Sequence, residues 1–307
     1  MAEQPDGLCS IQDFIRWGAS RFNAAGLHFG HGTDNALDEA AFLVLGALHL
    51  APTLPTSFRE CRLTPAERVR VTELIERRVV ERIPSAYLIG RAWFAGLEFE
   101  VDEHVLIPRS PIAELVEAGF DPWIDGDRVQ RLLDIGTGCG CIGIAAAVYL
   151  PDAEVDLVDI SPQALHVAQR NIERHHLGER VQVVESNLFA ALAGRRYDVI
   201  VSNPPYVAQP EFDQLPAEYH REPQQALLAG EDGLEIVLRI LDEAAQHLND
   251  RGILVVEVGN TQPALEAHLP GLPFTWLEFE RGGEGVFLLT REQLLEAQPL
   301  IEEALYA

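Results

Sequence analysis

The sequence predicts an α/β protein in which a seven-stranded, mostly parallel sheet ends in an antiparallel hairpin and follows a small helical domain. Three observations predict this fold. Apolar residues at helical spacing occupy the first 83 positions, short apolar strands alternate with helices from about residue 129, and a glycine-rich stretch separates two strand-like segments near the C-terminus. Alternating strands and helices favour a parallel sheet. We therefore expect a helical domain at 1–83, a β-hairpin linker at 84–108 and an α/β domain at 109–307.

Three helices are expected in the N-terminal part of the chain. Apolar residues over 11–19 form a stripe at helical spacing. A second helix is expected over 39–50, with Asp38 as its cap. A third begins after Thr64, where a capping residue is followed by proline and then glutamate, and it ends before Pro84.

The remaining elements follow from the alternation of apolar runs and turn residues. The run 93–101 reads as a β-hairpin turning at Ala95-Gly96, and prolines interrupt regular structure before a helix at 112–118. Segments 274–280 and 286–290 are expected to pair antiparallel across a glycine-rich turn. Ahead of these two segments, strands are expected at 132–135, 155–159, 181–184, 197–202 and 252–258, with helices at 142–149, 162–175 and 234–248.

The composition is strongly acidic. The chain has 307 residues, of which 47% are hydrophobic, enough for one large or two ordinary domains. Its 48 acids face 23 bases, all arginine, so the net charge is -25. This balance argues against extended contact with nucleic-acid phosphates and favours a basic partner.

Cysteine usage and the N-terminal residues favour a cytoplasmic location. No Cys-x-x-Cys pair occurs, and Cys139-x-Cys141 is too close for ordinary zinc-ligand spacing, so reduced thiols and no bound metal are expected. Glu3 and Asp6 stand where a signal peptide would be apolar. No apolar run approaches the ~18 residues of a membrane span. We expect a soluble protein without membrane association.

A glycine-rich loop at 134–140 follows the first strand of the sheet. Its glycines permit a tight turn with positive φ and let a ligand approach the backbone, while the following helix presents free N–H groups. Gly138-x-Gly140-x-x-Gly143 matches the dinucleotide fingerprint, which is weak evidence alone because a purely structural turn would match it too.

Polar residues beside this loop argue against a nicotinamide enzyme. Asp134 precedes the glycines, where a carboxylate would repel a pyrophosphate but attract an ammonium group. Asp159 ends the second strand, where it could accept both hydroxyls of a ribose or cap the helix that begins at Ser161. After the third strand, Asn187 and Leu188 could contact the edge and face of an adenine, or Asn187 could be an ordinary loop residue.

Asn203-Pro204-Pro205-Tyr206 follows the fourth strand and is the most informative segment of the chain. Two prolines without backbone donors force the chain to leave its strand abruptly. An amide, backbone carbonyls and an aromatic ring are thereby placed at the edge of the sheet where α/β proteins bind ligands. This group suits a planar, neutral nitrogen better than an ion. The alternative interpretation is a rigid strand exit without chemistry.

Together these features resemble the class I methyltransferases, which use S-adenosylmethionine and have a Rossmann-like sheet. Asn-Pro-Pro-Tyr after the fourth strand is typical of members that methylate planar amide or exocyclic amine nitrogens. The family often has Asp where this chain has Asn187, from which we expect a small effect on cofactor affinity. The resemblance implies that the cofactor is bound by Asp134, Ile135, Gly136, Thr137, Gly138, Asp159, Asn187, Leu188 and Asn203.

The resemblance extends over nearly the whole chain to the ribosomal-protein glutamine methyltransferases. That family modifies one glutamine in the third protein of the large ribosomal subunit. A sister family modifies the Gly-Gly-Gln motif of release factors and usually has Pro-Arg-Pro-Asp/Glu-Thr-Glu where this chain has residues 108–114. This difference and the Gly-His-Gly-Thr-Asp-Asn loop favour the ribosomal branch. The resemblance is carried by segments 29–35, 81–84, 92–94, 106–115 and 274–279.

The resemblance also implies a mechanism. The side-chain oxygen of Asn203 and the carbonyl of Pro204 would accept the two amide hydrogens, while Tyr206 faces Leu106 and Ile107 across the amide plane and Pro205 stiffens the turn. The methyl donor would leave as S-adenosylhomocysteine. The expected partner is a basic ribosomal protein, met before or during ribosome assembly and gripped with the help of the helical domain, with no direct binding of nucleic acid.

Two functions of other classes stay open at the level of the sequence. A nucleic-acid amino-methyltransferase could use the same four residues on a flipped base stacked on Tyr206, although the net charge counts against it. A non-catalytic assembly factor that binds S-adenosylmethionine is the second alternative, and the intact cluster at Asn203 argues against it.

Overall fold

The computed structural model describes residues 7–306 and divides the chain into two compact units. Residues 1–6, with Glu3 and Asp6, and residue 307 lie outside the described residues. We call the two parts the helical unit and the sheet unit. Within residues 7–306, the helical unit comprises the chain up to Ala92, Val101–Glu103 and Leu215–Glu222, and the sheet unit comprises Trp93–Glu100, His104–Gln214 and the chain from Pro223 onward.

The helical unit contains the three helices predicted from the sequence. These are α1 (Ile11–Ala24), α2 (Ala36–Ala47) and α3 (Pro65–Glu81), followed by the short α4 (Ser85–Ile89). Their apolar faces bury one core, because residues three and four apart lie on the same side of a helix. Its members include Phe14, Phe22, Leu43 and Ile75.

The helix caps agree with the sequence at α3 and differ from it at α2. Thr64 and Glu67 form the predicted reciprocal capping box. At α2 the expected cap, Asp38, is wrong. The side chain of Asn35 accepts from the backbone N–H groups of Leu37 and Asp38 at 3.0 and 2.9 Å. Because Asn35 stands in extended backbone immediately before the first turn, it reaches the free N–H groups that Asp38, already inside the helix, cannot.

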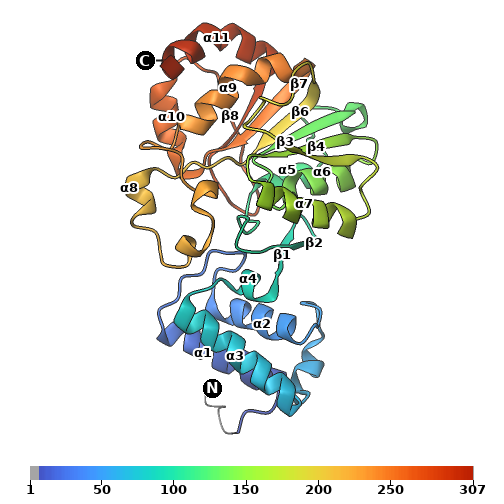
Figure 1. Cartoon of the computed structure of the whole chain (residues 1–307), viewed down its shortest axis with the longest axis vertical. Helices are drawn as coiled ribbons and strands as arrows, with labels where there is room; N and C mark the ends of the chain where they lie inside the picture. Colours follow the sequence, from blue (N-terminus) through green and yellow to red (C-terminus); the bar gives the residue numbers. More distant parts are fainter. Residues whose placement is uncertain (1–6, 307) are drawn as a thin grey trace. The chain divides into compact units, whose positions relative to one another are not determined.

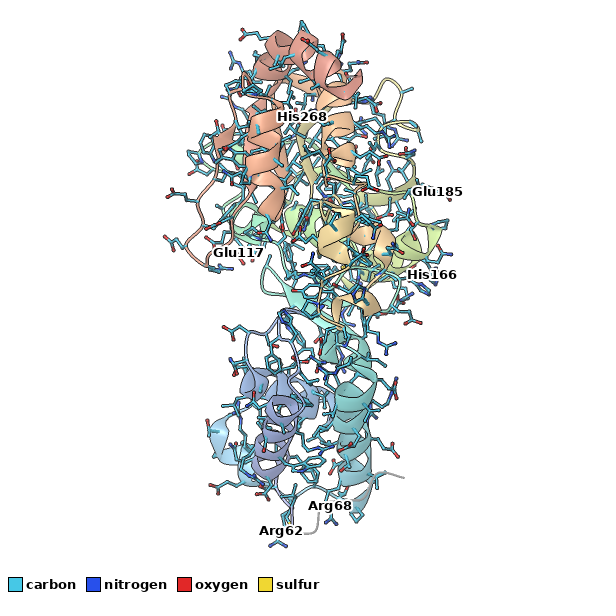
Figure 2. The ribbon with its side chains drawn as sticks, turned by 90° about the vertical axis from the view of Figure 1, so that its left-hand side faces the viewer. Arg62, Arg68, Glu117, His166, Glu185 and His268 are labelled. Carbon is cyan, nitrogen blue, oxygen red and sulfur yellow. The ribbon has the colours of Figure 1, made fainter. Side chains whose placement is uncertain are left out.

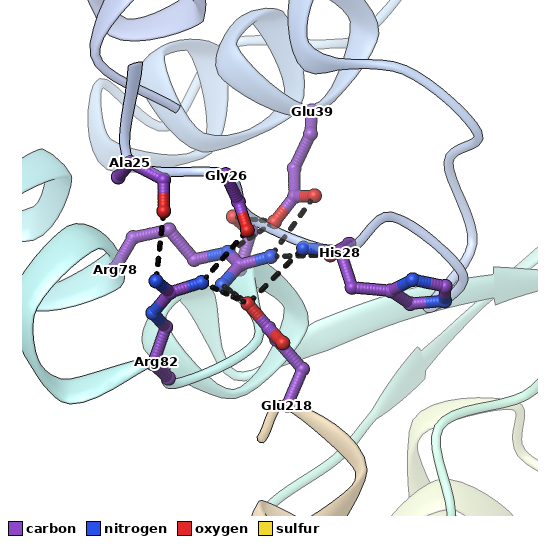
Figure 3. A network of polar contacts seen from close by, with 8 residues as sticks. Ala25, Gly26, His28, Glu39, Arg78, Arg82 and Glu218 are labelled. Atoms are coloured by element: carbon purple, nitrogen blue, oxygen red, sulfur yellow. Dashed lines mark hydrogen bonds and ion pairs between the residues drawn. The ribbon is translucent and has the colours of Figure 1, made fainter. Parts of the chain in front are cut away.

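A buried polar network holds the segment 215–222 in the helical unit (Figure 3). The guanidinium of Arg78 is fully buried and donates to Glu39 at 2.6 Å, to Glu218 at 3.3 Å and to the carbonyl of His28 at 2.9 Å. Glu218 also accepts from Arg82 at 3.2 Å. Two buried carboxylates therefore face two guanidinium groups, and the charges compensate one another.

The sheet unit contains the predicted seven-stranded sheet in the order β5-β4-β3-β6-β7-β9-β8. The first five strands in this order are parallel, and β9 pairs antiparallel with both β7 and β8. The predicted fold class is confirmed. The strands are β3 (Arg131–Ile135), β4 (Glu154–Asp159), β5 (Val181–Glu185), β6 (Tyr197–Ser202), β7 (Leu248–Glu257), β8 (Thr275–Trp276) and β9 (Val286–Thr290).

The terminal hairpin is shorter than its sequence pattern suggests, because β8 has two residues where a strand was expected over 274–280. The backbone N–H groups of Glu280 and Arg281 are bound by the carboxylate of Glu114 instead of by a neighbouring strand. A side chain thus replaces the ladder partners in this stretch, and the strand ends early.

Helices cover both faces of the sheet (Figure 1). The alternation of side chains sends Leu132, Val155 and Leu157 into one core with α6, while Leu133, Val158 and Ile200 pack with α9 on the other face. One face is covered by α5 (Ile112–Glu117), α6 (Cys141–Tyr149) and α7 (Pro162–Arg174), and the other by α9 (Glu235–His247) and α11 (Arg291–Tyr306).

The predicted β-hairpin is present as β1 (Arg91–Phe94) and β2 (Leu97–Glu100). Its two turn residues, Ala95 and Gly96, both have positive φ, of 47° and 74°, which is the turn type that matches the twist of paired strands. Short helices α8 (Gln209–Phe212) and α10 (Gln262–His268) lie in the connections of the sheet unit. Over residues 7–306, none of the helices combines the length and apolar character that spanning a membrane requires.

Candidate active site

A cavity of about 280 Å³ lies within the sheet unit, at the carboxyl ends of the parallel strands. The loops after β3, β4, β5 and β6 all contribute to its lining. Since β3 lies between β4 and β6, the connections that leave β3 and β6 diverge at this point, which is where open α/β sheets bind ligands.

The loop after β3 brings Ile135, Gly136, Thr137 and Gly138 to the cavity. Gly136 and Gly138 have φ of 68° and 56°, in the left-handed region that favours glycine. A Cβ added at Gly138 would meet no atom within 4 Å, and one at Gly136 would approach the backbone of residues 203 and 204 only to 4.0 Å. The turn therefore requires these glycines and leaves its cavity side open for a ligand.

Asp134 lies behind this loop and is not among the residues that line the cavity. Its Oδ2 accepts from the Thr137 hydroxyl at 2.6 Å and from the Gly143 N–H at 2.9 Å. Its Oδ1 is buried without a hydrogen-bond partner among residues 7–306, and burial raises the pKa of Asp134 to about 6. A buried acceptor without a donor is a group that a cationic ligand can satisfy.

The loops after β4 and β5 contribute Asp159, Asn187 and Leu188 to the cavity. The carboxylate of Asp159 accepts from the N–H groups of Gly138 and Ser161, both at 2.9 Å, and burial raises its pKa. The helix that follows is capped by the Ser161 hydroxyl, so Asp159 is not the cap. The side-chain oxygen of Asn187 accepts from Arg239 at 3.0 Å.

The strand exit after β6 places Asn203, Pro204 and Pro205 in the lining of the cavity. Ser202, the last residue of β6, donates from its hydroxyl to the Ile135 carbonyl at 2.8 Å and so joins this exit to the glycine loop. Both prolines follow trans peptide bonds, since the cis bond found among the described residues precedes Pro122.

Tyr206 and Ile107, which the sequence assigned to the same pocket, do not line the cavity, whereas Leu106 does. Ile107 is buried. The ring of Tyr206 packs on Gly259, where an added Cβ would lie 2.7 Å from it. Its hydroxyl donates to Glu257 at 3.4 Å. The structure thus gathers the predicted residues at one site, with Asp134, Ile107 and Tyr206 behind its surface.

Several residues near the cavity were not singled out from the sequence. His104, Ser110 and Arg239 line the cavity, and Glu257 lies beside it. Other histidines, such as His166 and His268, are exposed on the surface of the sheet unit (Figure 2). The one available signal for Glu257 is an acid inside the apolar run 253–258, which is rare in a buried strand.

Comparison with known proteins assigns the class. Residues 123–271 match the family profile described as methyltransferase small domain, and residues 13–90 match the PrmC N-terminal domain. A solved structure of the hMettl16 catalytic domain in complex with MAT2A 3'UTR hairpin 6 has a TM-score of 0.50 and 20% identity, covering 74% of this chain and 81% of that one. This likeness shows the fold alone. Fold and profiles together define a class I methyltransferase preceded by a helical domain.

Curated relatives identify the family. The chain is 51% identical to the ribosomal protein uL3 glutamine methyltransferase of Xanthomonas campestris pv. campestris, over 98% of both chains. It is 52% identical to that of Xylella fastidiosa, over 94% of this chain and 93% of the relative, and 47% identical to that of Francisella tularensis subsp. tularensis, over 95% and 93%. The chain belongs to the family of the ribosomal protein uL3 glutamine methyltransferases.

Proposed function

We propose that this protein transfers a methyl group from S-adenosylmethionine to the side-chain amide nitrogen of one glutamine in ribosomal protein uL3. The observation that carries the proposal is the placement of Asn203, Pro204 and Pro205 in the same cavity as the glycine loop after the neighbouring strand β3. The names of the relatives support the choice of substrate.

The residues of the cavity fit the proposed cofactor. The open face of the loop at 135–138 suits close approach of a ligand to the backbone. Asp134 lies behind the lining of the cavity, and its partnerless Oδ1 is assigned to the ammonium of the methionine moiety. Asp159 is assigned to the ribose hydroxyls, because each of its oxygens has one N–H donor and keeps further acceptor capacity. Asn187 and Leu188 are assigned to the adenine, and Asn203 is assigned to both the cofactor and the substrate.

The chemistry asked of the protein is orientation. A carboxamide nitrogen is a weak nucleophile because its lone pair is delocalised into the carbonyl group. The Asn203 side-chain oxygen and the Pro204 carbonyl accept its two hydrogens and direct the nitrogen toward the methyl group that S-adenosylmethionine supplies. Orientation of this kind is worth on the order of 7–11 kcal/mol at best. S-adenosylmethionine, when bound, would supply the methyl group from its sulfonium, and the methylated amide would release one proton to water.

The rest of the chain is assigned to recognition. We assign residues 1–83 to gripping the protein substrate, 84–108 to a linker that includes the hairpin, and 109–307 to the methyltransferase domain. Tyr206, Leu106 and Ile107 shape the acceptor side. The net charge of -25 supports a basic ribosomal protein as partner, met before or during ribosome assembly in the cytoplasm.

The test is methyl transfer from labelled S-adenosylmethionine to purified uL3, followed by mass spectrometry. One methyl group on one glutamine of uL3 is the expected result. Methylation of the Gly-Gly-Gln motif of a release factor in place of uL3, or of nucleic acid in place of protein, would contradict the assignment. Binding of the cofactor without transfer to any of these would point to a non-catalytic protein.

The Asn203→Ala variant tests the mechanism. Turnover on uL3 should fall roughly 100-fold or more, because one of the two amide acceptors is lost. The dissociation constant of S-adenosylmethionine, measured by calorimetry, should change far less. Near wild-type turnover of Asn203→Ala would show that the amide nitrogen is oriented by other groups.

A further inference from the structure

We infer that Glu257 is a positioning residue of the methyl-acceptor side: it ties the turn at 106–111 to the strand exit at 203–206 through the hydroxyls of Ser110 and Tyr206. Both segments contribute to the lining of the cavity. The inference rests on the proposed function for the identity of the acceptor, while the contacts that carry it are independent of the substrate.

Glu257 is held by the central part of the sheet. It is the last residue of β7, and Val256 beside it pairs with Ser202 at the end of β6. Glu257 itself pairs with Val286 of β9. A strand bonded on both sides moves little, so a carboxylate at its end is a fixed reference point beside the exit that carries Asn203.

The two carboxylate oxygens bind two different segments of the chain. Oε2 accepts from the Ser110 hydroxyl at 2.5 Å, and Oε1 accepts from the Tyr206 hydroxyl at 3.4 Å. The Ser110 oxygen in turn accepts from the N–H of Ile112 at 3.2 Å, which fixes the direction in which its single hydrogen points. Ser110 and Glu257 are 147 residues apart in the sequence, so the bond joins segments that local structure cannot align.

Each segment is also packed closely against glycine. An added Cβ at Gly259 would lie 2.7 Å from the Tyr206 ring, and one at Gly283 would lie 2.6 Å from Pro111. These contacts limit how far each segment can move toward the glycine-containing connection that it packs on. The Glu257 carboxylate adds the bonds that set their lateral positions, because hydrogen bonds are directional and packing contacts are not.

Glu257 is suited to positioning and not to proton transfer from the substrate. It is 5% exposed, and both of its oxygens already accept from protein hydroxyls. Burial raises its pKa to about 7, with Ser110, Arg109 and Tyr206 acting in the opposite direction. Burying the carboxyl group of Glu257 costs folding free energy that an apolar residue would not. The presence of an acid at this position therefore points to the arrangement of segments that its two hydrogen bonds impose.

Steady-state kinetics of four variants test the role. Glu257→Ala removes both bonds, Ser110→Ala and Tyr206→Phe each remove one, and Glu257→Gln keeps an oxygen acceptor and the volume. Glu257→Ala should lower kcat on uL3 roughly 10- to 100-fold, while the dissociation constant of S-adenosylmethionine changes less than about threefold. Glu257→Gln should recover most of the loss. Glu154→Gln, an exposed acid of β4, is the matched control and should behave as wild type.

Coupling between the variants separates positioning from a general structural role. Ser110→Ala combined with Glu257→Ala should cost no more than Glu257→Ala alone, because both remove the same bond. Independent, multiplicative losses would overturn the inference, as would a loss of cofactor binding in proportion to the loss of turnover. If Glu257→Ala does not fold, Ser110→Ala combined with Tyr206→Phe removes the same two bonds from the donor side and should lower kcat as far as is expected of Glu257→Ala.

Hydrogen exchange supplies a readout that needs no substrate. Amides at 106–112 and 203–206 should exchange faster in Glu257→Ala than in wild type, whereas those of β3 and β4 should not. Unchanged exchange in both segments would refute the positioning role. Failure of the wild-type protein to methylate uL3 would refute the proposed function and leave this exchange measurement standing as the test of the inference.

Discussion

The helical unit and the sheet unit both bury carboxylates, but they surround them differently. In the helical unit, burial would raise the pKa of Glu218, yet backbone N–H groups, Arg82 and Arg78 together hold it below its ordinary value. At the cavity edge of the sheet unit, burial dominates and raises the pKa of Asp134 to about 6 and that of Glu257 to about 7.

The difference distinguishes buried acids that stabilise the fold from buried acids that belong to a functional site. A buried acid that faces a guanidinium group keeps its charge and fixes the chain around it, as Glu218 does for the segment 215–222. A buried acid left with hydroxyl and N–H donors is poorly stabilised as an ion, and such groups gather at functional sites. Asp134 and Glu257 are of the second kind, and both lie at the cavity edge of the sheet.

The largest effect is expected from Arg78→Ala. Removing the guanidinium takes away the cation that the buried carboxylates of Glu39 and Glu218 share, so the free energy of unfolding should fall by about 3–5 kcal/mol in urea denaturation. Arg77→Ala is the matched control on the same helix, because Arg77 is half exposed and makes one i,i+4 pair with Glu81, worth less than about 0.5 kcal/mol. Equal losses for the two variants would show that the buried network is not the stabilising element.

The next largest effect is a dependence of stability on pH at Glu257. Its pKa is near 4.5 in the unfolded chain and about 7 in the folded protein, so between these values the folded state binds the extra proton. Wild-type stability therefore falls as pH rises from 4.5 to 7, and a glutamine at this position does not titrate. Stability of Glu257→Gln minus that of wild type should grow by up to about 3 kcal/mol over this window.

Asp156→Asn is the control for the sign of this effect. Burial of Asp156 is outweighed by bonds from Tyr197, Gln182 and Arg195, so its pKa is lowered from 3.8. Its contribution to stability is present above that value and is lost only as the pH falls below it. The difference between Asp156→Asn and wild type should thus stay flat from pH 4.5 to 7. Thermal unfolding across this range distinguishes the two variants. If the stability difference between Glu257→Gln and wild type does not change with pH, the Glu257 carboxylate is stabilised as an ion in the folded protein.

The sequence was sufficient where the signal is local. The apolar runs predicted the strands of the parallel sheet, and the capping box at Thr64 predicted the start of α3, because each depends on residues within one turn or strand. The glycine loop and Asn203-Pro204-Pro205 were likewise placed at the correct edge, since parallel strands end together.

Contacts between side chains far apart in the sequence could not be predicted. Arg78 and Glu218 are 140 residues apart, and nothing in the pattern around either one names the other. The same holds for Ser110 and Glu257. The cap of α2 failed for a different reason: Asn35 and Asp38 are both good caps, and the backbone conformation that selects Asn35 is not readable from composition.

Asp134→Asn makes the comparison between the two units sharpest, with the smallest expected effect. Asparagine has the same shape, and its oxygen can keep the bonds from Thr137 and Gly143. Because the pKa of Asp134 is raised in the folded protein, its ionised carboxylate costs stability at pH 7, so Asp134→Asn should be at least as stable as wild type there. Its amide nitrogen would then occupy the place of the partnerless Oδ1 and meet the ammonium of S-adenosylmethionine as a second donor. Cofactor affinity should weaken about tenfold by calorimetry, the loss of one charge-assisted bond. Should Asp134→Asn instead unfold more easily and bind the cofactor as wild type does, Asp134 would belong with Glu218 among the acids that hold the fold.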